Sequence, residues 1–230
     1  MTDDQSTSWT LIRGAAAGAA VAREAFARRY EPVVRASLCA RWRGTPRIQD
    51  VEDAVQDVFA ECLKPDGALD RADPTRSGGF RGFLFGVTRN VARRVEEQQA
   101  RRVDMARGGY SEDGDPELPA RDASLATTFE KEWASTLLRE AAVEQTRRAG
   151  ALGDAAIRRV ELLRLRFQDG LAIRDIAARW EVEPSWLHHQ FATARDEFRR
   201  ALETVVRVHF EGSDEEIERE CLRLVAALSG

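Results

Sequence analysis

Hydrophobic side chains recur every three or four positions along most of this chain, which is the spacing of one face of an α-helix. The first such block runs from about Ser8 to Arg43, the second covers about 49–63, and the third extends from Phe80 to at least Arg102. Alternating runs of β-branched residues are missing, and Ala, Arg, Leu and Glu, which favour helices, dominate. The pattern predicts an all-α fold.

The helical blocks fall into two groups separated by a polar segment. Residues 64–79 are rich in Pro, Gly and Asp and predict a loop, whereas residues 104–124 combine Gly, Pro and acidic residues as a linker does. We expect two small helical domains joined by a flexible linker, with an extra C-terminal helix. The expected boundaries are 8–103 for the first domain, 104–124 for the linker, 125–203 for the second domain and 204–230 for an acidic helical extension. The helices expected after the linker cover about 125–149, 154–168, 172–180, 184–202 and 213–228.

Charge restricts the possible partners of this chain. The formal net charge is −4, and all but two of the 35 basic residues are arginines. This balance argues against a uniformly basic nucleic-acid-binding protein, so any contact with DNA has to come from local patches. Arginine suits bidentate contacts with phosphate, although a GC-rich genome also supplies it by default.

The cysteines and the first residues indicate the cellular compartment. Cys39, Cys62 and Cys221 are far apart, form no CxxC pair and have no His three or four residues away, so neither a disulfide framework nor a zinc module is indicated. The opening "MTDDQSTSWT" carries acids where a signal peptide is basic, and no apolar run approaches the ~20 residues that span a bilayer. We expect a cytoplasmic protein with no membrane segment and no cofactor.

The stretch "IRDIAARWEVEPSWLHHQFATARDEFRRAL", residues 173–202, contains two helical patterns separated by a very short break. Pro184 suits the first turn of the second helix, where its missing N–H costs nothing. The residues expected to face inward are Ile173, Ile176, Ala177, Trp180 and Val182 before this turn, and Leu187, Phe191, Ala194, Phe198 and Leu202 after it. This spacing predicts a helix-turn-helix, and an ordinary amphipathic hairpin is the alternative.

The second helix of this pair carries candidate DNA contacts outside its buried face. The N-terminal end of a recognition helix enters the major groove, and polar side chains there can contact base edges or phosphates. The adjacent His188 and His189 point about 100° apart and have no further ligand at a useful spacing, which argues against a metal site. The candidate DNA-binding residues are Ser185, Trp186, His188, His189, Gln190, Arg195 and Arg199.

Several segments, read together, carry a family pattern. "VELLRLRFQDGLAIRDIAARW" resembles region four of the sigma-70 family of RNA polymerase initiation factors. In the N-terminal half, "FARRYEPVV", "VEDAVQDVFAECL" and "FRGFLFGVTRNVARR" resemble region two of the same family. The resemblance covers roughly residues 20–103 and 125–203, and it lacks a recognisable region three, as in the compact extracytoplasmic-function (ECF) group. It implies a region-two helical bundle and a region-four helix-turn-helix domain.

The resemblance implies that the helix at about 49–63 docks on the clamp helices of the polymerase β′ subunit, with the β flap as a further contact of the factor. The pattern of the helix agrees, because one apolar stripe beside a dense acidic face suits a basic partner. A solvated acidic face is the plain alternative. The implied polymerase-binding residues are Asp50, Glu52, Asp53, Gln56 and Asp57.

The resemblance places the helix from Phe80 where the family opens and reads the −10 promoter element. Seven arginines against three acids leave residues 81–107 with a local charge of +4, and neutralisation of phosphates supplies much of the affinity for DNA. Such a surface can also hold single-stranded bases. We expect Phe83, Leu84 and Val87 to lie in the core rather than to stack on bases. The implied −10 residues are Phe80, Arg81, Arg89, Asn90, Arg93 and Arg94.

Two features depart from the family pattern. "HHQ" at 188–190 replaces the usual Lys or Arg, Glu181 stands where a turn often has Gly, and Trp186 either contacts DNA or packs against the preceding helix. The tail is also longer than in a minimal factor, with a capping-box pattern at Ser213 and Glu216 and a local charge of −4 over 211–230. The tail helix either caps the second domain or lies across its DNA-binding face.

The resemblance therefore predicts a sigma factor that binds core RNA polymerase and directs it to promoters. It would recognise the −35 element with the helix at 184–202, and it would read and melt the −10 element with the helix from Phe80. Promoter DNA is the second partner, and an anti-sigma factor is left open. The alternatives are a helix-turn-helix regulator that does not recruit polymerase and a protein-binding helical adaptor. No metal cluster, phosphate-binding loop or nucleophile arrangement in the sequence indicates an enzyme.

Overall fold

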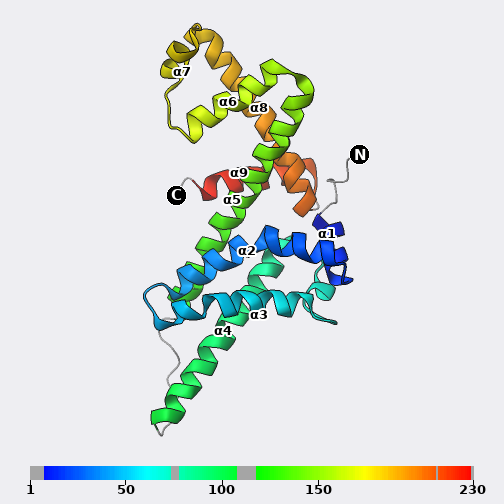
Figure 1. Cartoon of the computed structure of the whole chain (residues 1–230), viewed down its shortest axis with the longest axis vertical. Helices are drawn as coiled ribbons and strands as arrows, with labels where there is room; N and C mark the ends of the chain where they lie inside the picture. Colours follow the sequence, from blue (N-terminus) through cyan, green and yellow to red (C-terminus); the bar gives the residue numbers. More distant parts are fainter. Residues whose placement is uncertain (1–7, 74–77, 108–117, 211, 229–230) are drawn as a thin grey trace. The chain divides into compact units, whose positions relative to one another are not determined.

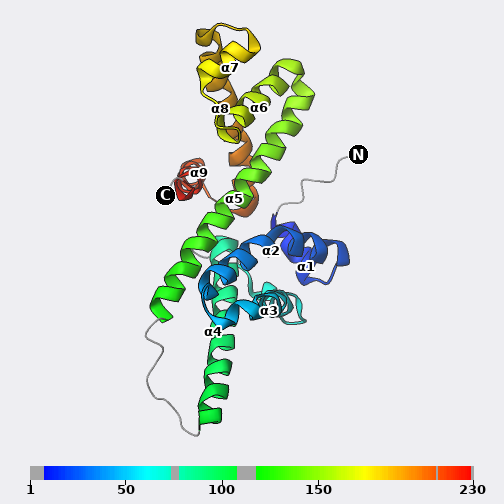
Figure 2. The ribbon, with the colours of Figure 1, turned by 60° about the vertical axis from the view of Figure 1, so that its left-hand side comes forward.

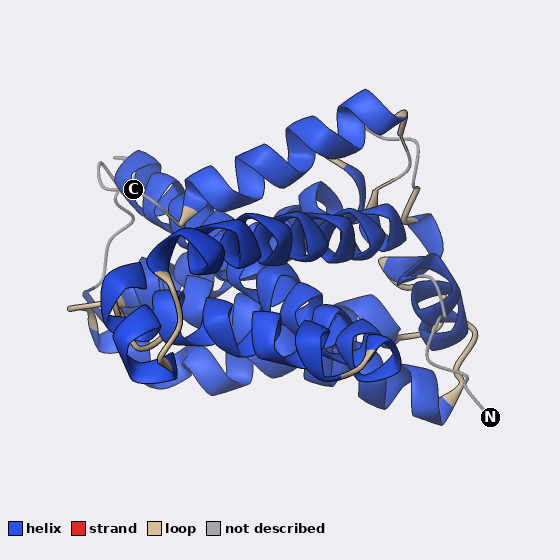
Figure 3. Cartoon of the chain, turned by 90° about the horizontal axis from the view of Figure 1, so that it is seen from above, coloured by secondary structure: helices blue, strands red, loops and turns tan. Residues whose placement is uncertain are grey.

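The computed structural model describes residues 8–73, 78–107, 118–210 and 212–228. Within these ranges all regular elements are helices, and Figure 3 draws no strand among them. This confirms the predicted all-α fold. The chain divides into two compact units: unit 1 comprises 1–136, 208–211 and 226–230, and unit 2 comprises 137–207 and 212–225. No helix in the described ranges is both long enough and apolar enough to cross a membrane.

Unit 1 is built from the N-terminal helices and the first part of α5. In this unit α1 packs on α2, α2 on α3, and α3 on α4, as Figures 1 and 2 show. Two 3-10 helices join these elements. The elements are α1 (Ser8–Ala16), α2 (Ala20–Trp42), η1 (Pro46–Asp50), α3 (Val51–Leu63), η2 (Leu69–Arg71), α4 (Gly79–Arg107) and α5 (Leu118–Leu152).

The predicted single block from Ser8 to Arg43 is in fact two helices, so that prediction is wrong. The chain leaves the helical path after α1 and passes through Gly18, whose φ is 88°. Glycine adopts this left-handed conformation without the steric cost that a Cβ atom adds. The break lets α1 fold back onto α2, where it buries Trp9, Ile12 and Ala15.

Aromatic rings from three helices form the core of unit 1. Tyr30 of α2 lies with its ring centroid 5.0 Å from that of Phe80 on α4 and stacks at 5.7 Å on Trp133 of α5. Phe26 packs edge-on against Phe80 at 5.9 Å, and Phe129 stacks on Trp133 at 6.2 Å. The first part of α5 is therefore an integral part of unit 1.

The structure also changes the boundaries of the predicted linker at 104–124. Helix α4 continues to Arg107, and α5 already begins at Leu118, so both flanks of the predicted linker are helical; residues 108–117 lie outside the described ranges. Within α5, Leu125, Phe129 and Trp133 follow one another at steps of four and are all buried. This spacing is one face of a helix, and it fixes α5 on unit 1.

Unit 2 contains the second part of α5 and most of the remaining helices. Its core is formed by Leu162, Leu165, Ile176, Ala177 and Leu187, which confirms the predicted inward face of residues 173–187. The partly buried side chains around this core are those of Leu171, Ile173, Trp180, Val182 and Phe191. The elements are α6 (Asp154–Phe167), α7 (Ile173–Trp180), α8 (Pro184–His209) and α9 (Asp214–Ala227), with the last residues of α8 and α9 assigned to unit 1.

Candidate nucleic-acid interface

A three-residue turn fixes the angle between α7 and α8. Glu181 adopts the left-handed conformation, with φ 52° and ψ 46°, and its backbone N–H donates to the carbonyl oxygen of Ala178. The N–H of Val182 donates to the carbonyl oxygen of Ala177 at 3.0 Å. These bonds close the end of α7, and Pro184 then begins α8. The pair is a helix-turn-helix, as the spacing predicts.

The N-terminal end of α8 presents a cluster of polar and aromatic side chains to solvent. Leu187 and Ala194 are fully buried, and they fix the rotation of the helix. Ser185, His188 and His189 are therefore exposed, and Gln190 is half-buried. Trp186 is 44 % exposed, which favours an accessible side chain over one that packs fully against the preceding helix. We call Ser185, Trp186, His188, His189 and Gln190 the recognition end of α8.

Two arginines continue the exposed face of α8 beyond the recognition end. Arg195 is exposed and lies over the ring of Phe191, with its guanidinium carbon 5.9 Å from the ring centroid. Arg199 is exposed and lies 3.6 Å from the carboxylate of Asp196. Among the described residues no group of three or more His, Cys, Asp or Glu side chains could hold a metal ion.

The acidic face of α3 is partly engaged within unit 1. Asp50, just before α3, accepts a hydrogen bond from Gln99, and Glu52 pairs with Arg35. Asp57 lies 3.5 Å from the guanidinium of Arg94. The remaining two predicted polymerase-binding residues, Asp53 and Gln56, are exposed. The opposite face of α3 is buried through Val51, Ala54, Val55, Val58 and Cys62.

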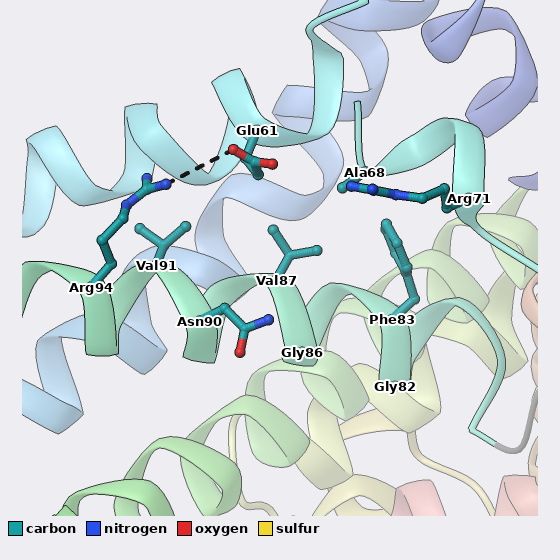
Figure 4. Close-up of a pocket in the computed structure, with 10 residues that line it drawn as sticks. All are labelled: Glu61, Ala68, Arg71, Gly82, Phe83, Gly86, Val87, Asn90, Val91 and Arg94. Carbon is teal, nitrogen blue, oxygen red and sulfur yellow. Dashed lines mark ion pairs between the residues drawn. The ribbon is translucent and has the colours of Figure 1, made fainter. Parts of the chain in front are cut away.

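A pocket of about 630 Å³ opens between α3, η2 and α4. Figure 4 shows Phe83, Val87 and Val91 pointing from α4 toward α3 and η2. Arg71 lies over the Phe83 end, and Arg94 pairs with Glu61 at 3.9 Å at the other end. The remaining lining residues are Ala68, Gly82, Gly86 and Asn90. The pocket thus has an apolar floor with arginines at its rim.

The pocket changes two sequence-based predictions about α4. Only Leu84 of the three apolar residues assigned to the core is fully buried, whereas Phe83 and Val87 line the pocket. Phe80 was assigned to the DNA-binding surface, but it is fully buried among Phe26, Tyr30 and Trp133. That assignment is wrong, because a ring at the centre of the core presents no surface to DNA.

Three predicted DNA-binding arginines of α4 pair with acids of α5. Arg81 donates to Glu130 at 3.0 Å. Arg89 and Arg93 donate to the same oxygen of Asp122, at 3.1 and 2.5 Å. Their side chains are 40 % and 36 % exposed, so both remain partly accessible to solvent. Asn90 and Arg94, in contrast, face the pocket.

Asp122 also contacts a buried ion pair that ties α2 to α4. The Arg41 side chain is fully buried and donates two hydrogen bonds to Glu96, at 2.9 and 2.8 Å, and one to Asp122 at 2.5 Å. Trp42 adds a hydrogen bond to Glu96 at 2.8 Å. Burial opposes the charge of Arg41, but the two carboxylates hold its pKa above the usual value. Burial likewise opposes the charge of Asp122, yet hydrogen bonds from Arg41 and Arg93 lower its pKa.

The C-terminal helix α9 begins with the predicted capping box. The hydroxyl of Ser213 accepts from the N–H of Glu216 at 3.4 Å, and the Glu216 carboxylate accepts from the N–H of Ser213 at 2.8 Å. Ile217, Cys221 and Leu224 are buried, and Asp214 pairs with Arg207 of α8 at 2.5 Å. These contacts involve the C-terminal part of α8, so they favour a helix that caps unit 2 over one that covers the recognition end.

Sequence reasoning missed the acids that pair with α4 and one pocket arginine. Asp122 lies in the predicted linker, and Arg71 lies in the predicted loop 64–79. Glu130 precedes Trp133 by three positions on α5, and the α4 arginines with which the two acids pair lie at least 29 positions away in the sequence. Helical spacing from Leu125 onward was the one available signal that α5 packs on another element.

No family model matches this chain, and the search of curated proteins finds no match either.

Proposed function

We propose that this chain is a transcription initiation sigma factor of the extracytoplasmic-function type. It binds core RNA polymerase and directs the enzyme to promoters through two DNA-contacting surfaces, one in each unit. The observation that carries the proposal is the helix-turn-helix of α7 and α8, whose buried face leaves the recognition end of α8 accessible. Promoter DNA at the −35 element is the ligand of this end.

The second surface is the pocket and the adjacent arginines of α4. Single-stranded bases bind proteins by stacking on aromatic rings beside a positively charged groove. Phe83 supplies a ring at the pocket, and Arg71 and Arg94 supply charge at its rim. The volume of about 630 Å³ lies within the range of ordinary ligand pockets, about 300–1,000 Å³. This surface would hold bases of the melted −10 element.

The third surface is the exposed acidic face of α3, which would dock on the basic clamp helices of the polymerase β′ subunit. Asp53 and Gln56 are exposed on this face, and the buried stripe beneath them holds α3 in place on α2 and α4. Rim charges of this kind mainly set the association rate and the choice of partner.

Binding to core polymerase tests the proposal directly. The chain is mixed with core RNA polymerase, the complex is isolated by size-exclusion chromatography, and transcripts from a genomic DNA library are sequenced. We expect a stable complex and defined start sites. Asp53→Lys should weaken the complex roughly tenfold or more, because it places like charge against a basic partner. Asp175→Lys, at an exposed position of α7, is the matched control and should leave the complex intact.

The other outcomes identify the alternatives. A chain that binds duplex DNA with a steep salt dependence but forms no polymerase complex is a helix-turn-helix regulator. A chain that binds neither DNA nor polymerase is a protein-binding adaptor. The double substitution Trp186→Ala and His189→Ala tests the recognition end. It should lower the affinity for selected promoters only if this end reads the −35 element. Arg174→Ala on α7 is the control for a general loss of charge.

A further inference from the structure

We propose that the first two turns of α5 act as a latch on the −10 surface, in which Asp122 occupies the arginines that DNA phosphates would bind. This inference rests on the proposed function and concerns the regulation of the same surface. In the latched state Arg89 and Arg93 are paired with Asp122; in the open state a phosphate of single-stranded DNA replaces the carboxylate.

The geometry of Asp122 suits a competitor of phosphate. One oxygen of its carboxylate accepts from both Arg89 and Arg93, which lie four positions apart on α4. Phosphate oxygens accept from arginine in the same manner, and guanidinium groups bind either anion. The two arginine side chains are 40 % and 36 % exposed, so an incoming phosphate can reach them before the carboxylate leaves.

The latched state leaves Arg93 incompletely satisfied. Its Nη2 donates to Asp122, but its Nε is buried and has no hydrogen-bond partner. A buried donor without a partner is unfavourable, because it has lost its hydrogen bonds to water. A phosphate group carries more acceptor oxygens than the single oxygen that Asp122 offers here, so exchange gives Arg93 a route to additional bonds.

Release of the latch disturbs little of the core. Among residues 120–124 none is buried, and Ser124 contributes one long hydrogen bond, 3.4 Å, to the carbonyl oxygen of Ala40. The apolar anchor of α5 begins only at Leu125, which is fully buried. Arg41 keeps both hydrogen bonds to Glu96, but its Nη1 loses Asp122, so release requires water to reach this donor as the first turns unwind. The first turns of α5 can therefore unwind while the rest of the helix stays on unit 1.

A second acid of α5, Glu130, pairs with an arginine of the same surface, but it lies in the part of α5 that is anchored by buried side chains. Glu130 pairs with Arg81 at 3.0 Å and lies between the buried Phe129 and Trp133 in the sequence of α5. This pair stays in place when residues 118–124 unwind. Asp122 alone is therefore the switch, and Glu130 is a fixed contact.

The test measures binding of single-stranded DNA by the full chain. Asp122→Asn removes the charge but keeps an oxygen that can accept from Arg41. Affinity for a fluorescently labelled single-stranded DNA of degenerate sequence is measured by anisotropy across a salt series. We expect Asp122→Asn to bind roughly threefold to tenfold more tightly than the natural sequence, the range expected for release of a partly exposed ion pair. The gain should vanish when Arg89→Ala and Arg93→Ala are added.

The control removes one negative charge from α4, the helix that carries Arg89 and Arg93. Glu97 pairs with Arg101 on α4 at 3.3 Å, so Glu97→Gln changes net charge equally without touching Arg89 or Arg93. The latch is overturned if Asp122→Asn binds single-stranded DNA no more tightly than Glu97→Gln does. It is also overturned if the gain in affinity persists after Arg89→Ala and Arg93→Ala are added. If Asp122→Asn folds poorly, amide hydrogen exchange of the natural chain provides the test. Residues 118–124 should lose protection when single-stranded DNA binds, and unchanged protection would overturn the inference.

The polymerase complex is measured in parallel for the natural chain and for Asp122→Asn. A normal complex with no gain in DNA affinity refutes the latch and leaves the proposed function standing. A gain in DNA affinity without any polymerase complex refutes the proposed function and leaves the latch as a property of a DNA-binding protein.

Discussion

Glu181 holds the turn of the helix-turn-helix in a conformation that normally favours glycine. Its φ of 52° places the Cβ atom close to the following carbonyl oxygen, which costs a non-glycine residue about 1 kcal/mol. The side chain is exposed, so nothing in the core requires a glutamate there. The turn is nevertheless fixed by its hydrogen bonds to Ala177 and Ala178.

Glu181→Gly should therefore stabilise the chain. We expect the free energy of unfolding to rise by about 0.5 kcal/mol, because relief of strain exceeds the larger backbone entropy that glycine loses on folding. Urea unfolding followed by circular dichroism measures the change. Glu181→Ala keeps the Cβ atom and should give no gain, and equal stabilisation by both substitutions would show that loss of the carboxylate, not backbone strain, is responsible.

Glu144 makes the stability of unit 2 depend on pH. Hydrogen bonds from Arg147, at 2.7 Å, and from Arg148, at 2.6 Å, lower its pKa from 4.5 to about 2. Arg148 also donates to Thr204 of α8 at 2.7 Å, so the cluster joins two helices of the unit. A carboxyl whose folded pKa is depressed adds stability above its unfolded pKa, and this is lost as pH falls through the folded value.

Glu144→Gln should consequently destabilise the chain at neutral pH but hardly at all near pH 2. We expect a loss of about 1 kcal/mol at pH 7, typical of a partly exposed charge network, and a shrinking difference as pH falls from about 4.5 to 2. Unfolding in urea at several pH values measures it, with Glu183→Gln as the charge-matched substitution. A loss that is the same at pH 3 and pH 7 would contradict the role of the ionised carboxylate.

Single residues also show where sequence reasoning loses information. The inward face of residues 173–202 could be predicted because helical spacing records it locally. Phe80 could not be placed, because an aromatic residue at the start of a basic helix suits either a core or a DNA surface until its neighbours are known. Those neighbours, Tyr30 and Trp133, lie about 50 positions away on either side.

At the scale of elements, α5 shows the same limit. The helix could be predicted from Leu125 onward because its apolar steps are regular, but its first turns carry Pro119 and Asp122 and resemble a linker. These turns pair with arginines of α2 and α4 through Asp122. The arginines lie 29 to 81 positions before Asp122 in the sequence, so no local pattern indicates the contacts. The pairing of Asp122 with these arginines therefore comes from the structure and not from the sequence pattern.

Helix α9 contacts α8 far from the recognition end. Its contacts with α8 lie near Arg207, and burial together with the charge of Glu203 raises the pKa of Cys221 to about 11. Arg207 follows His189 by 18 positions on the same helix, a distance of about 27 Å at 1.5 Å per residue. A helix of four turns attached there does not need to cover the recognition end.

Deletion of residues 211–230 should destabilise unit 2 without changing its affinity for duplex DNA. The deletion removes the buried side chains of Ile217, Cys221 and Leu224 and exposes the apolar surface that they cover. This loss should lower the free energy of unfolding by roughly 3 kcal/mol. Promoter binding per folded molecule is measured by anisotropy at a temperature where both proteins are folded. A clear increase in affinity after deletion would instead support an inhibitory tail.

At the scale of the whole molecule, the chain has two cores that share one helix. Phe26, Tyr30 and Trp133 belong to unit 1, whereas Leu162 and Leu187 belong to unit 2, and the division falls within α5 after Thr136. The sequence predicted two domains but placed a flexible segment between them. The division instead falls inside α5, between Thr136 and Leu137.

We expect the two cores to unfold as separate units. Leu162→Ala removes a fully buried side chain from unit 2 and should cost about 2–5 kcal/mol. Because this side chain belongs to the hydrophobic cluster of unit 2, hydrogen exchange should accelerate in α6, α7 and the first part of α8, while α2 and α3 keep their protection. Leu38→Ala, at an equally buried position of α2, should produce the reverse pattern. Equal loss of protection in both units from either substitution would mean that the two units unfold as one cooperative structure, and the proposed −10 and −35 surfaces would then lose their order together.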